Sequence, residues 1–157
     1  MTAIEALDER ALHEGVAILA AADPALGGIV ARHGPPPLWA RPSGFETLVA
    51  IVLEQQVSLA SGAAALARLR AAAGAVTPGR VVALGEDGAR GAGLTRQKAR
   101  YVVALGAAIL EGRFDPEALA RAPDDEARSR LTGLLGIGRW TADIYLLMAL
   151  GRPDIWP

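Results

Sequence analysis

Cysteine is absent from the 157-residue sequence, which excludes disulfide bonds, cysteine-ligated zinc and cysteine-held iron–sulfur clusters. Aromatic residues are also scarce, at 4% of the chain against 52% for hydrophobic residues as a whole, so alanine, leucine and valine must build the core. That composition favours helices. The longest apolar run, Val16 to Ala22, is too short to cross a bilayer, and no basic leader opens the chain. These absences predict a soluble, cytoplasmic protein with no disulfide partner and no membrane partner.

An excess of positive charge is missing as well. With 16 basic and 17 acidic residues, the net charge is −1, which argues against binding nucleic acid through bulk charge. Backbone N–H groups and a few local arginines remain available to bind phosphate. His33 has no second ligand near it in the sequence, so we expect no metal site there.

Helical periodicity without long strand-like alternation predicts an all-α fold. The chain is short enough for one domain or for two small lobes that share a core. Two N-terminal helices are expected, over about 3–22 and 25–31, before a proline-rich break. We therefore divide the sequence into residues 1–38, the N-terminal helices and linker, and residues 39–157, the main helical domain.

Capping residues mark the helices of the main domain. Ser43 with Glu46 forms a capping box, which predicts a helix from Phe45 to Glu54. Further N-cap candidates, each followed by a helical pattern, are Ser58, Thr77, Thr95 and Asp115. Residues 85–93 are expected to form a loop.

A glycine-rich turn between two helices is predicted near the C-terminus, at about 124–150. Gly136 and Gly138 flank Ile137, so the backbone is expected to take positive φ values and to reverse sharply. An apolar stripe at helical spacing follows, formed by Trp140, Ile144, Leu147 and Met148. Because the glycines leave the first N–H groups of the second helix uncovered, a phosphate can bind there without a basic side chain. For Gly-x-Gly alone, a tight turn without any ligand is the alternative.

The string from Leu135 to Asp143, Leu-Gly-Ile-Gly-Arg-Trp-Thr-Ala-Asp, resembles the helix-hairpin-helix of DNA repair glycosylases, and in particular the 3-methyladenine DNA glycosylase II type. Phe45 to Ser58 and Gly93 to Ala99 resemble further parts of these enzymes. The resemblance implies an all-α helix-hairpin-helix glycosylase fold with two helical lobes. It implies base-excision repair by a monofunctional DNA glycosylase, which hydrolyses the N-glycosidic bond of a 3-methyladenine-like base flipped out of double-stranded DNA. We expect a nucleoid-associated monomer that requires no cofactor.

The same resemblance assigns binding residues. Contacts to DNA are expected at Gly136, Ile137, Gly138, Thr141, Gln55 and Gln56. A structural Na⁺ or K⁺ ion is expected on the main-chain carbonyls of Thr132, Leu134 and Ile137. For Arg96, Lys98 and Arg100 a solvated helix face is the favoured interpretation, because scattered helix charges usually form one, and contacts to phosphate are the second.

Two adjacent glutamines at a helix junction would, in isolation, be read as a solvated polar turn. In the family, the junction that corresponds to Gln55 and Gln56 approaches the minor groove and fills the gap left by the extruded nucleotide. Amides suit that task, since they can meet base edges without a charge to desolvate.

Trp140 is expected to form a wall of the base pocket. Stacking on an aromatic face is worth about 1–3 kcal/mol per base, and a cationic alkylated base gains roughly 2 kcal/mol more when desolvated. On spacing alone, a core position for Trp140 is about equally favoured. Family members that also cut the strand carry a lysine here, whereas Lys98 is the only lysine of this sequence, so no lyase step is expected.

The catalytic aspartate implied by the resemblance has no counterpart in the sequence and is expected beyond Pro157, together with the closing helices of the lobe. Asp143 matches a non-catalytic motif position, and Asp154 is expected in a turn. The 157-residue chain is therefore expected to be inactive by itself. It would be part of a DNA-3-methyladenine glycosylase or, alternatively, a non-catalytic helix-hairpin-helix DNA-binding module. An unrelated helical interaction domain is the third alternative.

Overall fold

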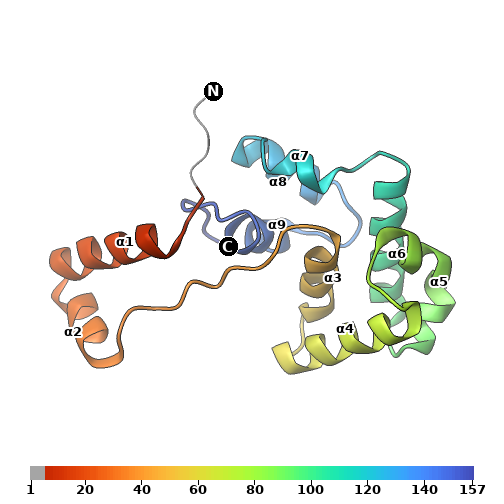
Figure 1. Cartoon of the computed structure of the whole chain (residues 1–157), viewed down its shortest axis with the longest axis horizontal. Helices are drawn as coiled ribbons and strands as arrows, with labels where there is room; N and C mark the ends of the chain where they lie inside the picture. The colour runs from red at the N-terminus through yellow and green to blue at the C-terminus, as the bar shows by residue number, and fades with distance from the viewer. Residues whose placement is uncertain (1–5) are drawn as a thin grey trace.

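The computed structural model describes residues 6–157, and every regular element in that range is a helix (Figure 1). The predicted all-α class is therefore confirmed. In chain order the helices are α1 (Glu9–Ala22), α2 (Pro24–His33), α3 (Phe45–Glu54), α4 (Leu59–Ala73), α5 (Pro78–Gly91), α6 (Arg96–Leu110), α7 (Pro116–Leu119), α8 (Asp124–Thr132) and α9 (Arg139–Met148). None of these helices is both long and apolar enough to cross a membrane.

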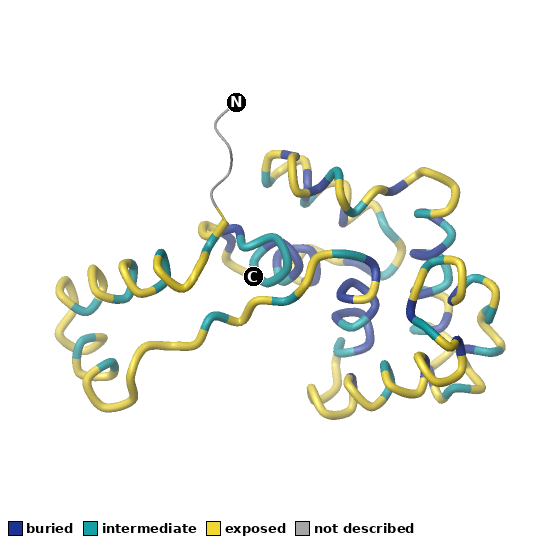
Figure 2. The backbone as a smooth tube through the Cα atoms, viewed as in Figure 1, coloured by how far each residue is buried: buried dark blue, intermediate teal, exposed yellow. Residues whose placement is uncertain are grey.

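Helices α1 and α2 form an antiparallel pair that projects from the rest of the molecule (Figure 1). Neither helix contains a buried residue, and Figure 2 shows exposed positions alternating with intermediate ones along the pair. The base of the pair is fixed by the Leu7 N–H, which donates a 2.6 Å hydrogen bond to the carbonyl of Gly151. The expected start of the first helix, at Ala3, lies outside the described residues. The predicted division between residues 38 and 39 falls within the extended segment that leads back to α3.

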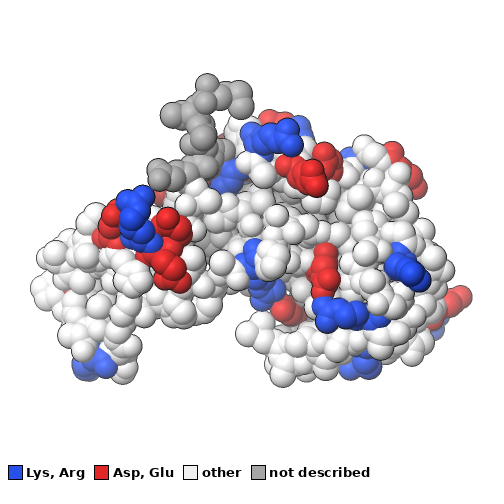
Figure 3. Space-filling model, viewed as in Figure 1, with Lys and Arg blue, Asp and Glu red and all other residues white. Residues whose placement is uncertain are grey.

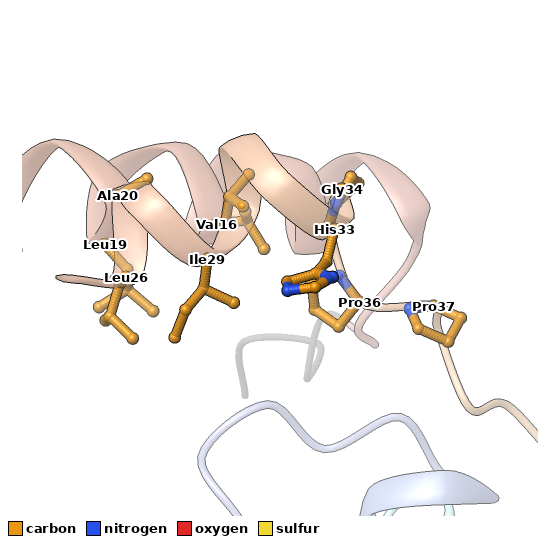
Figure 4. Close-up of a pocket in the computed structure, with 11 residues that line it drawn as sticks. Val16, Leu19, Ala20, Leu26, Ile29, His33, Gly34, Pro36 and Pro37 are labelled. Atoms are coloured by element: carbon orange, nitrogen blue, oxygen red, sulfur yellow. The ribbon is translucent and has the colours of Figure 1, made fainter. Parts of the chain in front are cut away.

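An apolar groove of about 470 Å³ runs between α1 and α2 and the prolines that follow them (Figure 4). Leu19, Leu26 and Ile29 line it, and His33 supplies its only polar side chain. No group of three His, Cys, Asp or Glu side chains that could hold a metal ion occurs within residues 6–157. The expectation that His33 holds no metal stays a prediction.

Helix α3 lies at the centre of the core and packs against α4, α6 and α9. Its apolar side chains are almost completely buried. Burying one such side chain is worth roughly 1.5–3 kcal/mol. The surrounding helices contribute further buried residues, among them Leu69, Leu105, Leu131 and Leu146. The predicted main domain is thus organised around this one helix.

Most predicted caps are confirmed, but the capping box at Ser43 is wrong. The side chains of Ser58, Thr77, Thr95 and Asp115 each accept a hydrogen bond from an N–H group of the following turn. At α3 the N-cap is Gly44, with φ 123°, and its N–H donates to the Tyr145 hydroxyl at 2.8 Å. Glu46 pairs with Arg70 instead. A tertiary contact with α9 therefore replaces the local cap.

The loop predicted over residues 85–93 is also wrong, since α5 continues to Gly91. Only Gly85 leaves helical geometry, with φ 70°, and the chain then resumes a helical path. Ala89 is completely buried after this kink. Its packing stabilises a short helical segment that the local glycine content disfavours.

Arg152 joins the end of the chain to α7 and α8. Its guanidinium is 2% exposed and donates to the carbonyls of Leu119, Ala120 and Ala122 at 3.0–3.3 Å. It also lies 3.1 Å from the carboxylate of Asp124. A buried charge of this kind is tolerated because hydrogen bonds replace its hydration, and it fixes the start of α8 against the residues that follow α9.

Candidate nucleic-acid interface

The turn between α8 and α9 depends on Gly136. Its φ is 84°, in the left-handed region that favours glycine. A Cβ atom at this position would also overlap the ring of Tyr101 on α6. The predicted positive φ is therefore confirmed at Gly136, and packing against α6 reinforces the need for glycine.

Gly138 differs, and the positive φ predicted for it is wrong. Its backbone is extended, with φ −86° and ψ 176°, which any residue can adopt. A Cβ atom there would meet nothing within 4 Å. Gly138 is the N-cap of α9 and makes no side-chain capping bond, so the N–H groups of the first turn remain uncovered. Neither backbone geometry nor internal packing requires glycine here, whereas close approach of an external anion would.

The turn is hydrogen-bonded to Gln55, the residue that follows α3. Its side-chain amide donates to the carbonyl of Gly136 at 2.9 Å and to the hydroxyl of Thr141 at 3.0 Å. Thr141 and Ile137 are both 5% exposed. Of the six residues predicted to contact DNA, the structure thus places Gln55, Thr141 and the Ile137 side chain in the support of the turn. DNA contacts by these three groups remain untested predictions.

Gln56 lies at the exposed tip between α3 and α4. Its φ of 58° is the only positive value among the non-glycine residues of the described chain. Such a conformation costs of the order of 1–3 kcal/mol and is often found at functional sites. Val57 and Leu59 beside it are 46% and 69% exposed. The geometry of this tip is compatible with the predicted insertion of Gln56 into DNA.

The Lys98 side chain caps the C-terminus of α3, a role that the sequence did not predict. Its ammonium donates to the carbonyls of Leu53 at 2.6 Å and Gln55 at 3.0 Å. These are the last carbonyls of a helix and attract positive charge. Partial burial lowers the pKa of Lys98. Its charge is thus engaged within the fold, whereas Arg96 and Arg100 are exposed.

Trp140 projects from the first turn of α9 and is 58% exposed, so the alternative of a core position is wrong. The stripe predicted from its spacing exists, but Ile144, Leu147 and Met148 are only partly buried. The face of α9 that enters the core is a different one, formed by Ala142, Tyr145 and Leu146. The stripe is therefore an accessible apolar surface that begins next to the uncovered N-terminus of α9.

Trp39 contributes a second exposed aromatic side chain, to which the sequence assigned no role. It is 67% exposed and lines a hollow of about 360 Å³ with Arg41, Leu59 and Met148. The segment is fixed there because the Arg41 N–H donates to the carbonyl of Met148 at 2.7 Å. Arg41 also pairs with Glu54 at 2.9 Å. One feature of the sequence could have pointed to Trp39: it is a tryptophan between prolines in a chain poor in aromatic residues.

Asp143 is a structural carboxylate. It is 1% exposed and accepts a 2.6 Å hydrogen bond from Nε of Arg128, which raises the pKa of that arginine. Its second oxygen lies 3.6 Å from Nε of Arg139. Asp154 is exposed near the end of the chain. Both oxygens of Asp143 are therefore engaged by arginines, and its non-catalytic role stays a prediction.

Charge of both signs is distributed over the visible face, without a continuous basic surface (Figure 3). Affinity for DNA would therefore have to come from local contacts, as the net charge predicted. Residues 132–138 of the turn line an open hollow, which includes the three residues predicted to hold a monovalent ion. One of those carbonyls, that of Leu134, already accepts from the Ile137 N–H at 3.2 Å.

Comparison with known proteins gives an independent assignment. The model of the "HhH-GPD superfamily base excision DNA repair protein" family matches residues 49–156, which is more than half of the chain. A putative DNA-3-methyladenine glycosylase, YfjP of Bacillus subtilis, is 25% identical over 140 residues, covering 84% of this chain and 49% of the relative. The chain spans about half the length of the curated relatives it matches.

Solved structures agree with this match. A DNA-3-methyladenine glycosidase from Bacillus halodurans superposes with a TM-score of 0.75 at 28% identity, covering 88% of this chain and 65% of that one. The Mag1 3-methyladenine DNA glycosylase of Schizosaccharomyces pombe, solved with abasic DNA, gives a TM-score of 0.81 at 24% identity, covering 92% and 73%. The latter likeness concerns the fold alone.

Proposed function

The chain belongs to the HhH-GPD superfamily of base excision DNA repair proteins, and from this membership we propose that it binds damaged double-stranded DNA for a monofunctional glycosylase. The substrate would be a 3-methyladenine-like base, alkylated at a ring nitrogen and flipped out of the duplex. The reaction would be hydrolysis of the N-glycosidic bond. A cytoplasmic location at the nucleoid would follow from this role.

The observation that carries the proposal is the position of Trp140. Its exposed ring lies two residues after Gly138, the N-cap of α9, and no side chain caps the N–H groups of that first turn, which could bind a phosphate. A nucleotide extruded beside that phosphate would bring its base onto the apolar face of α9. A cationic base gains from such a face both by stacking and by cation–π attraction.

The remaining residues support extrusion and restrict the chemistry. Gln56 at the tip would replace the extruded nucleotide in the stack, while Gln55 holds the turn in register with that tip. Extrusion costs a few kcal/mol and less at damaged pairs, which adds selectivity. Lys98 is engaged by two carbonyls of α3, so it would not form a Schiff base with the sugar. These features favour a monofunctional enzyme.

A monovalent cation at the hairpin forms part of the same proposal. The turn from 132 to 138 lines an open hollow, and backbone carbonyls are suitable ligands for Na⁺ or K⁺. Thr132, Leu134 and Ile137 would hold the ion. Its charge would add to the attraction between the N-terminus of α9 and a DNA phosphate.

A non-catalytic DNA-binding module is the second candidate. It is favoured by the position of Asp143, the carboxylate nearest to Trp140 in sequence, which is buried and paired with two arginines. A carboxylate held in this way does not approach the anomeric carbon of a flipped nucleotide. Base release by the isolated chain distinguishes the two candidates.

The proposal is tested by binding to duplexes that differ in one base. Residues 1–157 should bind a duplex with a single 7-methylguanine, a cationic alkylated base, more tightly than the unmodified duplex of the same sequence. Trp140→Ala should abolish this preference and retain the affinity for unmodified DNA. Trp156→Ala is the matched control for loss of an exposed tryptophan, since Trp156 is 92% exposed and is not among the residues assigned a DNA contact above. Equal affinity of the unsubstituted chain for both duplexes would contradict the proposal.

A further inference from the structure

The tip between α3 and α4 is a type II β-turn formed by residues 54–57. The Val57 N–H donates to the carbonyl of Glu54 at 3.4 Å, which closes the turn. Gln55 has φ −56° and ψ 128°, and Gln56 has φ 58°. A type II turn has such angles at its first central residue and requires a positive φ at its second, where glycine or asparagine is usual. Gln56 therefore occupies a position whose backbone conformation glutamine disfavours.

A type I turn over the same four residues would suit glutamine better. It differs from type II mainly by a flip of the peptide unit between the two central residues, and it gives the second of them a negative φ. The flip would turn the Gln55 carbonyl to the opposite side of the turn and change the direction of the Gln56 side chain. A contact from outside the turn must therefore hold this peptide unit in its type II orientation.

Lys98 makes that contact. Its ammonium donates to the Gln55 carbonyl, which belongs to the central peptide unit of the turn, at 3.0 Å. A second bond, to the carbonyl of Leu53 at 2.6 Å, anchors the ammonium on the end of α3. In a type I turn the Gln55 carbonyl would point away from Lys98, and the first bond would be lost. Because a hydrogen bond from a charged donor is roughly twice as strong as a neutral one, this loss opposes the flip.

The position of Lys98 is set by α6 and not by the turn. Its backbone N–H donates to the Thr95 hydroxyl oxygen at 3.2 Å, and the adjacent Ala99 is completely buried. Helix α6 also packs against α3. The ammonium thus reaches the turn from a separately fixed helix, so it can favour one turn geometry over the other.

We infer that Lys98 is a positioning residue, which holds the central peptide unit of the tip in the type II orientation and thereby sets the direction of the Gln56 side chain. The inference rests on the function proposed above, in which Gln56 enters the gap left by the extruded nucleotide. Lys98 then acts on DNA recognition through the backbone of Gln55. Its loss should reduce the preference for DNA with a gap more than the affinity for DNA in general.

The first measurement follows the turn itself, by NMR of isotope-labelled residues 1–157. The Gln56 N–H should show a strong nuclear Overhauser effect (NOE) to the Hα of Gln55, which is characteristic of a type II turn. In Lys98→Met, which removes the charge but keeps an unbranched side chain, a strong NOE between the two N–H groups should replace it. Adding Gln56→Gly to Lys98→Met should restore the first NOE, because glycine accepts a positive φ without steric cost.

An unchanged NOE pattern in Lys98→Met would overturn the inference. If Lys98→Met alone does not fold, the added Gln56→Gly should recover folding, since it relieves the turn. A failure to fold that glycine does not relieve would also overturn the inference, because Lys98 would then support the fold by another route.

The second measurement compares Kd values, at fixed salt, for an intact duplex and for one with a tetrahydrofuran abasic-site analogue. Lys98→Met should lower the preference for the abasic duplex about fivefold, the value of one modest side-chain contact to a base. Arg96→Met is the matched control, since it removes an exposed charge from the same turn of α6 and should weaken both duplexes equally. An unchanged preference in Lys98→Met would overturn the inference. No preference in the unsubstituted chain would instead overturn the proposed function, and the NOE pattern would still test the turn.

Discussion

The side-chain amide of Gln55 and the carbonyl of Gly136 are 81 residues apart in sequence and joined by a 2.9 Å hydrogen bond. This bond, with a second one to Thr141 at 3.0 Å, couples the α3–α4 tip to the hairpin turn. The distance between the residue that would enter the DNA and the turn that would bind its phosphate is thereby fixed. The two adjacent glutamines therefore differ: Gln55 has a structural role, and Gln56 is exposed.

Gln55→Ala should lower the free energy of unfolding by about 1–2 kcal/mol, because it removes two partly buried hydrogen bonds and leaves a carbonyl unpaired. Gln56→Ala should change the same free energy by less than about 0.5 kcal/mol, since Gln56 is exposed. Urea denaturation of both variants measures the contrast. Equal losses would show that the two residues share one role.

The two hairpin glycines should separate stability from DNA binding. Gly138→Val should fold normally, because its extended backbone and open surroundings accept a β-branched residue. It should nevertheless lose roughly tenfold in affinity for any duplex, the value of one hydrogen bond to a charged group. Gly136→Val should instead destabilise the fold, since φ 84° and Tyr101 leave no room for a side chain.

Melting curves and duplex Kd values at fixed salt distinguish these effects. Unchanged DNA affinity of folded Gly138→Val would contradict a phosphate site at the start of α9. A melting temperature of Gly136→Val equal to that of the unsubstituted chain would contradict the packing of Tyr101 on the turn.

The sequence predicted features that depend on neighbouring residues and missed those that depend on tertiary contacts. Ser58 and Thr95 cap their helices through bonds to the next turn, and local chemistry suffices for that. The box at Ser43 failed because Tyr145, far away in sequence, takes the N–H of Gly44. Local pattern does not encode such a partner.

The same distinction applies to the candidate site. The glycine turn and the tip residues could be located from their spacing, and so could the stripe that begins at Trp140. Whether that stripe faced the core or the outside depended on which side of α9 met α3, and Tyr145 rather than Trp140 took the core side. Lys98 likewise looked like a surface cation until α6 brought it to the end of α3.

Alkaline pH should destabilise the protein through Tyr145. Burial raises the pKa of this phenol above its ordinary value of about 10, partly offset by the hydrogen bond from Gly44. The stability that the neutral phenol contributes is thus fully present below that ordinary pKa and is lost as the pH rises through the raised one. In an ultraviolet titration, Tyr145→Phe should remove a late tyrosinate transition and reduce the fall in stability above about pH 10. A titration curve identical to that of the unsubstituted chain would contradict this assignment.

Purified residues 1–157 should not release 3-methyladenine from methylated DNA at an enzymatic rate. The departing base leaves positive charge on the sugar, and a carboxylate beside the anomeric carbon is needed to stabilise it. Asp143 is 1% exposed and held by Arg128 and Arg139, so it has no free oxygen to offer. Preorganised electrostatic stabilisation is often the largest catalytic contribution, and its absence should cost roughly 100-fold or more in rate.

The measurement compares base release by this chain with release by a complete alkylbase glycosylase under identical conditions, after confirming that both bind the methylated DNA. Comparable rates would contradict the prediction and would make a carboxylate of this chain catalytic. Asp154→Asn and Asp143→Asn then identify it, because a catalytic carboxylate loses base release at an unchanged melting temperature. Asp143→Asn should instead lower the melting temperature, since it removes the buried charged partner of Arg128 and leaves only the ion pair with the exposed Asp125. If Asp143→Asn loses both base release and melting temperature, Asp143 has a structural role. If Asp154→Asn loses base release alone, the exposed Asp154 is the catalytic group.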